Sequence, residues 1–113
     1  MSQWIGVDLD GTLAKYDGWQ GIDNIGEPIK PMIDRVKRWL ENGHTVKIMT
    51  ARVNSNQDKK KIEQARYWIE AWCLNHIGQK LEVTSEKDFE MAELWDDRAV
   101  SVVFNTGMPY PEY

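Results

Sequence analysis

Trp4-Ile5-Gly6-Val7-Asp8-Leu9-Asp10-Gly11-Thr12 is the stretch of sequence that decides the fold. A short apolar run, Trp4 to Val7, stops abruptly in a polar turn that contains glycine, which is typical of a buried strand and the loop after it. If the strand continued, Asp8 and Asp10 would point the same way, while Gly11 lets the backbone turn at once. We therefore expect two carboxylates to share one small volume at the carboxyl end of a strand.

The pattern of apolar runs that end in polar residues continues along the chain. We predict a loop or flap over 14–28, a helix from Ile29 that stops at Asn42-Gly43, and a strand over 45–49. A capping box, Ser55-x-x-Asp58, then begins a long helix that ends at Gly78. After it we predict a strand over 81–83, at most a turn or two of helix after 85–88, strands over 92–95 and 99–104, and an extended strap over 105–113.

Strands that alternate with helices predict an α/β fold. We expect a Rossmann-like parallel sheet of about five strands, with right-handed crossovers and helices on both faces. A chain of 113 residues fits one domain, 1–113. In such sheets ligands bind beyond the carboxyl ends of the strands, where the polar clusters of this sequence lie.

The composition of the chain argues against several classes of function. The hydrophobic share of 42% and the charged share of 28% are those of an ordinary soluble globular protein. The net charge of −4 provides no overall basic field for a polyanion. No apolar run approaches the ~20 residues of a bilayer span, and the first residues do not form a signal peptide. We therefore expect a cytoplasmic protein with no membrane partner, in agreement with the single Cys73.

The paired aspartates suit phosphoryl chemistry. Magnesium and a phosphoryl group require hard oxygen ligands and tolerate adjacent carboxylates. A free carboxylate such as that of Asp8 can be a nucleophile and form an aspartyl phosphate, and Asp10 is then well placed for proton transfer. An Asp-Gly turn is also ordinary turn chemistry, so a structural role for both residues stays open on these residues alone.

The sequence resembles the haloacid dehalogenase-like superfamily of phosphohydrolases over nearly the whole chain, through four ordered motifs. The matching residues are Asp8-Leu9-Asp10-Gly11-Thr12-Leu13 for the first motif, Thr50 after 46–49 for the second, Lys87 for the third, and Asp96-Asp97 after 93–95 for the fourth. The resemblance implies that Asp8 is the nucleophile and Asp10 the acid/base, that Thr50 binds the phosphoryl group, that Lys87 balances charge, and that the acidic fourth motif helps to hold Mg²⁺.

This resemblance also indicates how the ligands would be held. Asp8, Asp96, the backbone carbonyl of Asp10 and waters would complete a magnesium shell, and Asp97 would ligate directly, act through water, or pair with Arg98. Backbone amides around Leu9, Asp10 and Ala51 would form an anion nest. The residues expected at the phosphate are Leu9, Asp10, Gly11, Thr12 and Ala51, with Arg52 and Arg98 either contacting substrate or forming surface ion pairs.

The third motif departs from the family pattern. Asp88 stands where proline often follows the motif lysine, and the segment from Lys87 to Asp96 is short. Lys80 is a nearby competitor for the same role.

No cap domain fits between the motifs, so the expected site is open. A partner subunit in a homo-oligomer, the aromatic side chains Tyr16 and Trp19, or the tail could cover it. The expected function is magnesium-dependent hydrolysis of a phosphomonoester, either a small molecule such as a nucleotide or a nucleic-acid end.

Two other functions keep the same fold. The first is a noncatalytic phosphate-binding or regulatory module, which would have no need of an intact Asp8. The second is an end-processing module that works beside a partner enzyme, which calls for a basic track that the acidic composition does not show. Dehalogenation is disfavoured because it has no use for Asp10 or a magnesium cluster.

Overall fold

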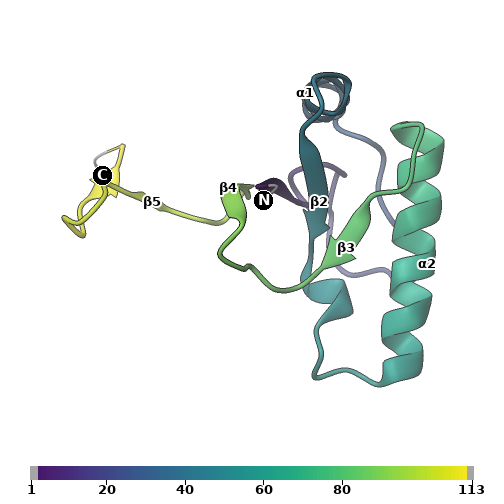
Figure 1. Ribbon diagram of the computed structural model, residues 1–113. Helices are drawn as coiled ribbons and strands as arrows, with labels where there is room; N and C mark the ends of the chain where they lie inside the picture. The colour runs from purple at the N-terminus through teal and green to yellow at the C-terminus, as the bar shows by residue number, and fades with distance from the viewer. Residues whose placement is uncertain (1–2, 112–113) are drawn as a thin grey trace.

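The computed structural model describes residues 3–111 (Figure 1). Its elements are β1 (Trp4–Asp8), α1 (Lys30–Glu41), β2 (Thr45–Met49), the 3-10 helix η1 (Ala51–Val53), α2 (Lys59–His76), β3 (Glu82–Thr84), β4 (Met91–Trp95), β5 (Ser101–Val102) and β6 (Pro109–Tyr110). The first four predicted strands and both long helices are present close to their predicted bounds. The predicted α/β class is confirmed, and the turn of helix predicted after 85–88 is absent there.

Within residues 3–111, the main sheet has four strands in the order β3-β2-β1-β4, all parallel. The prediction of about five strands is therefore wrong. In the segment predicted as the fifth, only Ser101–Val102 is extended, and it pairs antiparallel with Pro109–Tyr110. Asn105 and Gly107, at φ 64° and φ 74°, turn the chain between these strands, so the segment forms a local hairpin instead of joining β4.

Both helices cover the same face of the sheet, in contrast to the predicted cover on two faces. The chain steps in one direction from β1 to β2 to β3, and right-handed crossovers then place α1 and α2 on one side. The segment 85–90 between β3 and β4 contains no helix that could cover the other side. Strand and helix residues share one core: Ile5, Val7, Val46, Ile48 and Val83 from the strands, Met32, Ile33 and Val36 from α1, and Ala65, Ile69, Trp72 and Cys73 from α2.

On the opposite face of the sheet, neighbouring side chains cover Trp4. Trp4 is only 3% exposed; its indole Nε1 donates to Asp88 Oδ1 at 2.8 Å, and Lys47 Nζ lies 4.6 Å from its ring centroid. Gly6 makes room for this packing, because a Cβ there would lie 3.1 Å from Trp4 Cζ3 and 3.2 Å from Leu94 Cδ1. A substitution at Gly6 would therefore require Trp4 and Leu94 to shift by a few tenths of an ångström.

The helix ends follow the predicted signals, with one exception. Gly43 and Gly78, at φ 84° and φ 100°, follow the two helices as predicted. The capping box is wrong: α2 begins at Lys59 after Asp58, whose side chain makes no capping hydrogen bond, and Ser55 lies in the preceding turn.

The tail forms a hairpin that projects away from the sheet (Figure 1). The predicted strap over 105–113 is thus folded back as β6, and its last two residues lie outside the described residues. Val102, Phe104 and Tyr110 are exposed along this hairpin. Neither α1 nor α2, the longest helices of the described chain, combines the length and apolar character that a bilayer crossing requires.

Candidate active site

The parallel strands bring the predicted polar clusters to one edge of the sheet. Asp8 ends β1, Thr50 follows β2, and Asp96-Asp97 follows β4. Because β1 lies between β2 and β4, the side chains that follow these two neighbouring strands flank Asp8. This juxtaposition agrees with the rule that ligands bind beyond the carboxyl ends of parallel strands.

The turn after β1 is built to bring Asp97 close. The amides of Leu13 and Ala14 donate to the carbonyl of Leu9 at 3.0 and 2.9 Å, and Gly11 has φ 90°. A Cβ at Gly11 would come within 2.7 Å of Asp97 Oδ2. Glycine is therefore required here for both its backbone conformation and the approach of the carboxylate.

Thr12 links two of the carboxylates. Its hydroxyl donates to Asp97 Oδ1 at 3.2 Å, lies 3.5 Å from Asp8 Oδ2, and accepts from the Asp97 amide at 3.0 Å. The sequence predicted Thr12 at the phosphate, whereas the structure uses its hydroxyl to fix Asp97 beside Asp8. The Leu9 side chain is fully buried, so only its backbone could serve in the predicted anion nest.

Asp8, Asp96 and Asp97 form a cluster in which one carboxylate oxygen from each residue lies within 4.8 Å of the other two. Burial, together with a hydrogen bond to Asp97 and the negative charges of Asp96 and Asp97, raises the pKa of Asp8 to about 7. Hard oxygen donors at this spacing suit a small divalent cation. A cation would also relieve the repulsion that raises the Asp8 pKa, so these residues fit the predicted magnesium ion.

Asp10, also predicted at the metal, does not join this side-chain cluster. Its carboxylate accepts two hydrogen bonds from Arg52, from Nε at 2.8 Å and from Nη2 at 2.9 Å. The Arg52 side chain is only 6% exposed and that of Asp10 21% exposed. Arg52 thus forms a largely buried ion pair with Asp10 in this structure, and the predicted substrate contact of Arg52 stays a prediction.

Three further contacts fix Arg52 in place. Its Nη2 also donates to the carbonyl of Asn24 at 3.0 Å, and its Cζ lies 4.9 Å from the Trp19 ring centroid. Its backbone amide donates to Thr50 Oγ1 at 3.1 Å, and Thr50 is the N-cap residue of η1. Among residues 3–111, Arg52 Nη1 is the buried side-chain nitrogen without a hydrogen-bond partner. Arg52 therefore joins the flap to Asp10 and keeps one donor unused.

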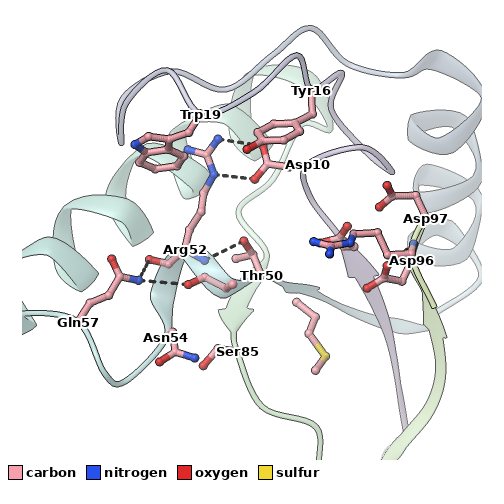
Figure 2. Close-up of a pocket in the computed structure, with 14 residues that line it drawn as sticks. Asp10, Tyr16, Trp19, Thr50, Arg52, Asn54, Gln57, Ser85, Asp96 and Asp97 are labelled. Atoms are coloured by element: carbon pink, nitrogen blue, oxygen red, sulfur yellow. Dashed lines mark hydrogen bonds and ion pairs between the residues drawn. The ribbon is translucent and has the colours of Figure 1, made fainter.

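These residues line a cavity of about 660 Å³. Figure 2 shows the carboxylates of Asp96 and Asp97 at one end and Trp19, Asn54 and Gln57 at the other, with the Asp10 and Arg52 pair between them. The lining residues are Asp8, Asp10, Tyr16, Trp19, Met49, Thr50, Ala51, Arg52, Asn54, Gln57, Ser85, Asp96, Asp97 and Arg98. Thr50 and Ala51, which the sequence predicts at the phosphate, are among these lining residues.

Lys87 is not among the residues that line the cavity, and it is exposed. Arg98 does line the cavity, next to the carboxylate cluster, and its amide donates to Asp96 Oδ1 at 2.7 Å. In the described part of the chain, no ion pair joins Arg98 to Asp97. Arg52 and Arg98 are therefore the cationic side chains at the cavity in this structure.

Sequence reasoning missed four lining residues, of which Met49 is the last residue of β2. Ser85 follows β3 directly, so its place at a strand end was a usable signal. Asn54 and Gln57 lie between η1 and α2, in a polar stretch that resembles any solvated loop. Their place depends on the η1 turn, for which the sequence has no comparable signal.

A comparison with solved structures finds the same fold in a bacterial protein. The structure of a conserved protein coded by a locus from Bacteroides thetaiotaomicron matches with a TM-score of 0.60 and 18% sequence identity, over 88% of this chain and 79% of that chain. At this identity the likeness shows the α/β fold alone. The sequence matches no protein-family model and no curated protein.

Proposed function

We propose that the protein hydrolyses phosphomonoesters with Mg²⁺, through an aspartyl phosphate on Asp8. The observation that carries this proposal is the cluster of Asp8, Asp96 and Asp97 at one end of the cavity. Asp8 is half-buried and ends a central strand, which is a rigid position for a nucleophile. The resemblance of the motifs to the haloacid dehalogenase-like superfamily supports the same reading.

Asp8, Asp96 and Asp97 would hold the magnesium ion. When bound, the ion neutralises charge on the phosphoryl oxygens and on the carboxylates, which otherwise repel the substrate.

The chain's own residues would carry the two displacements. An Asp8 carboxylate oxygen bonds to phosphorus as the ester P–O bond breaks, and the leaving oxygen takes a proton from Asp10. Water then attacks the phosphorus of the aspartyl phosphate, gives a proton to Asp10, and releases inorganic phosphate and the Asp8 carboxylate. Arg98 at the cavity would attract the phosphate dianion.

The ion pair with Arg52 places a condition on this cycle. A carboxylate that accepts two hydrogen bonds from a guanidinium cannot donate a proton, so Asp10 must leave Arg52 before it acts as an acid. Arg52 has a further donor, Nη1, without a partner among the described residues. A substrate oxygen that binds Arg52 would replace the lost contact, so substrate entry and release of Asp10 would be coupled.

The same ion pair favours a second candidate, a phosphate-binding module without turnover. In that case Asp10 stays paired to Arg52 permanently, and the cavity binds phosphate esters and releases them unchanged. The two candidates differ in whether a phosphate–oxygen bond is broken.

Phosphate release distinguishes the candidates. The wild-type protein, with Mg²⁺, would be incubated with an aryl phosphate and with a panel of phosphorylated metabolites, and free phosphate and phosphorylated protein mass would be measured. We expect turnover with transient phosphorylation, both lost in Asp8→Asn and retained in the surface control Asp34→Asn. Ester binding without phosphate release would support the second candidate and contradict the first.

A further inference from the structure

The cavity is much larger than a phosphoryl group needs. Its volume of about 660 Å³ falls within the range of roughly 300–1,000 Å³ that holds whole small-molecule ligands. Asp96 and Asp97 lie at one end, so a phosphate bound near Asp8 leaves the other end for the rest of the substrate (Figure 2). The side chains at that other end therefore bear on the identity of the leaving group.

One wall of this end is aromatic. Trp19 is 61% exposed and Tyr16 is 48% exposed, although both line the cavity. The Arg52 guanidinium lies against one face of the Trp19 ring, 4.9 Å from its centroid, and Arg52 is itself fixed by Asp10 and Asn24. The indole is thus held in position while much of its surface stays open to a planar ligand.

The same end of the cavity also has a hydrogen-bond acceptor and a donor, from Gln57 and Asn54 (Figure 2). Gln57 Nε2 donates to the carbonyls of Ala51 at 3.1 Å and Arg52 at 2.9 Å, which fixes the amide. Asn54 Oδ1 accepts from the Asn56 amide at 2.8 Å. Within residues 3–111, Gln57 Oε1 accepts no hydrogen bond and Asn54 Nδ2 donates none. An oriented acceptor and an oriented donor remain for the edge of a ligand.

We propose that this end of the cavity binds the base of a nucleoside phosphate, with the base stacked on Trp19 and its edge hydrogen-bonded to Gln57 and Asn54. Nucleobases combine a planar ring for stacking with donors and acceptors along one edge. A sugar phosphate or an aliphatic phosphate lacks the ring. The inference rests on the proposed phosphohydrolase function, and it applies equally to a free nucleotide and to a phosphorylated polynucleotide end.

The test compares phosphate esters that carry a base with a sugar phosphate that lacks one. Values of kcat/KM with Mg²⁺ would be measured for nucleoside 5′- and 3′-monophosphates, for ribose 5-phosphate, and for 5′- and 3′-phosphorylated oligonucleotides. We expect Trp19→Leu to lower kcat/KM for nucleoside monophosphates by about tenfold or more beyond any change for ribose 5-phosphate, the scale of a lost base–aromatic stack. The value for ribose 5-phosphate reports the part of the effect that passes through Arg52, which contacts the Trp19 ring. Trp68→Leu is the matched control, since Trp68 is partly exposed on α2 against Tyr67 and outside the cavity lining.

A second variant tests the hydrogen-bonding side. Gln57→Leu should reduce the discrimination between bases while the preference for nucleotides over ribose 5-phosphate persists. Faster cleavage of oligonucleotide ends than of mononucleotides would identify polynucleotides as the source of the base, and the reverse order would identify free nucleotides.

Failure of this inference can be distinguished from failure of the proposed function. Equal cleavage of nucleotides and ribose 5-phosphate, with Trp19→Leu affecting both alike, would overturn the base site and leave the phosphatase standing. If no ester is cleaved, calorimetric titration of the wild-type protein with nucleoside monophosphates decides the inference. Binding that Trp19→Leu weakens would support the base site, and absence of binding would overturn it.

Discussion

Replacing Asp8 by asparagine should stabilise the protein in the absence of a divalent cation. Burial first, then the hydrogen bond to Asp97 and the charges of Asp96 and Asp97, raises the pKa of Asp8 to about 7, against about 3.9 in an unfolded chain. At 1.36 kcal/mol per unit, the shift corresponds to an upper limit of about 4 kcal/mol. Asp8 is half-buried, so solvent screening reduces the expected cost to about 1–2 kcal/mol.

The raised pKa fixes the sign of the pH dependence. Between about pH 4 and pH 7 the folded state binds more protons at Asp8 than the unfolded state does, so wild-type stability falls as the pH rises through this window. Above pH 7 the cost is complete. Asparagine has the shape of aspartate without its charge, so Asp8→Asn should raise the melting temperature at pH 8 by roughly 4–10 °C and have little effect at pH 4.5.

Thermal unfolding in a chelator, from pH 4.5 to pH 8, measures this difference. The control is Asp34→Asn on α1, because Lys30 lowers the pKa of Asp34 through a hydrogen bond and ion pair. Asp34→Asn should therefore bring no gain at pH 8. Added Mg²⁺ should raise the melting temperature of the wild type more than that of Asp8→Asn. An Asp8→Asn protein no more stable than wild type at pH 8, or equally stabilised at pH 4.5, would refute the reasoning.

Three further predictions concern turnover. Hydrolysis of an aryl phosphate should stop in a strong chelator and return with Mg²⁺ but poorly with Ca²⁺, which prefers more ligands and longer bonds; full turnover in chelator would contradict this. Asp10→Asn should slow single-turnover cleavage of an alkyl phosphate more than that of an aryl phosphate, within a loss of ~10²- to 10⁴-fold, because an aryl leaving oxygen needs little protonation. Arg98→Ala should lower turnover more than Lys87→Ala, with Lys80→Ala as control; the opposite order would show that Lys87 reaches the cavity when substrate is bound.

Most of the secondary structure could be predicted because apolar periodicity and turn residues act locally. The strand over 45–49 and the helix stops at Gly43 and Gly78 depend on neighbouring residues alone. The choice of the sheet face that the helices cover does not depend on neighbouring residues alone. It follows from the strand order and from the absence of a helix in 85–90, and the loss of the fifth strand follows from a hairpin that closes within 99–111. These are properties of chain connection that periodicity does not report.

The candidate site divides in the same way. Asp8, Asp96 and Asp97 could be placed together from sequence because each follows the end of a strand, and parallel strands end at one edge. Lys87 also follows a strand, but it is exposed outside the cavity lining. A position shortly after a strand end is therefore not a sufficient signal for a place in the cavity, because the conformation of the loop sets the direction of the side chain.

The pairing of Asp10 with Arg52 shows why the two aspartates of the first motif cannot be told apart by local reasoning. Asp8 and Asp10 are two residues apart, yet only Asp8 joins the carboxylate cluster, while Asp10 pairs with a guanidinium 42 residues away. That guanidinium is positioned by Thr50 and by the flap carbonyl of Asn24. The surroundings of Asp10 are thus set by a turn and a flap that meet only in the folded chain. A ligand that takes Arg52 away would free the Asp10 carboxylate for a new contact, whereas Asp8, among other carboxylates, is placed to share a cation with them.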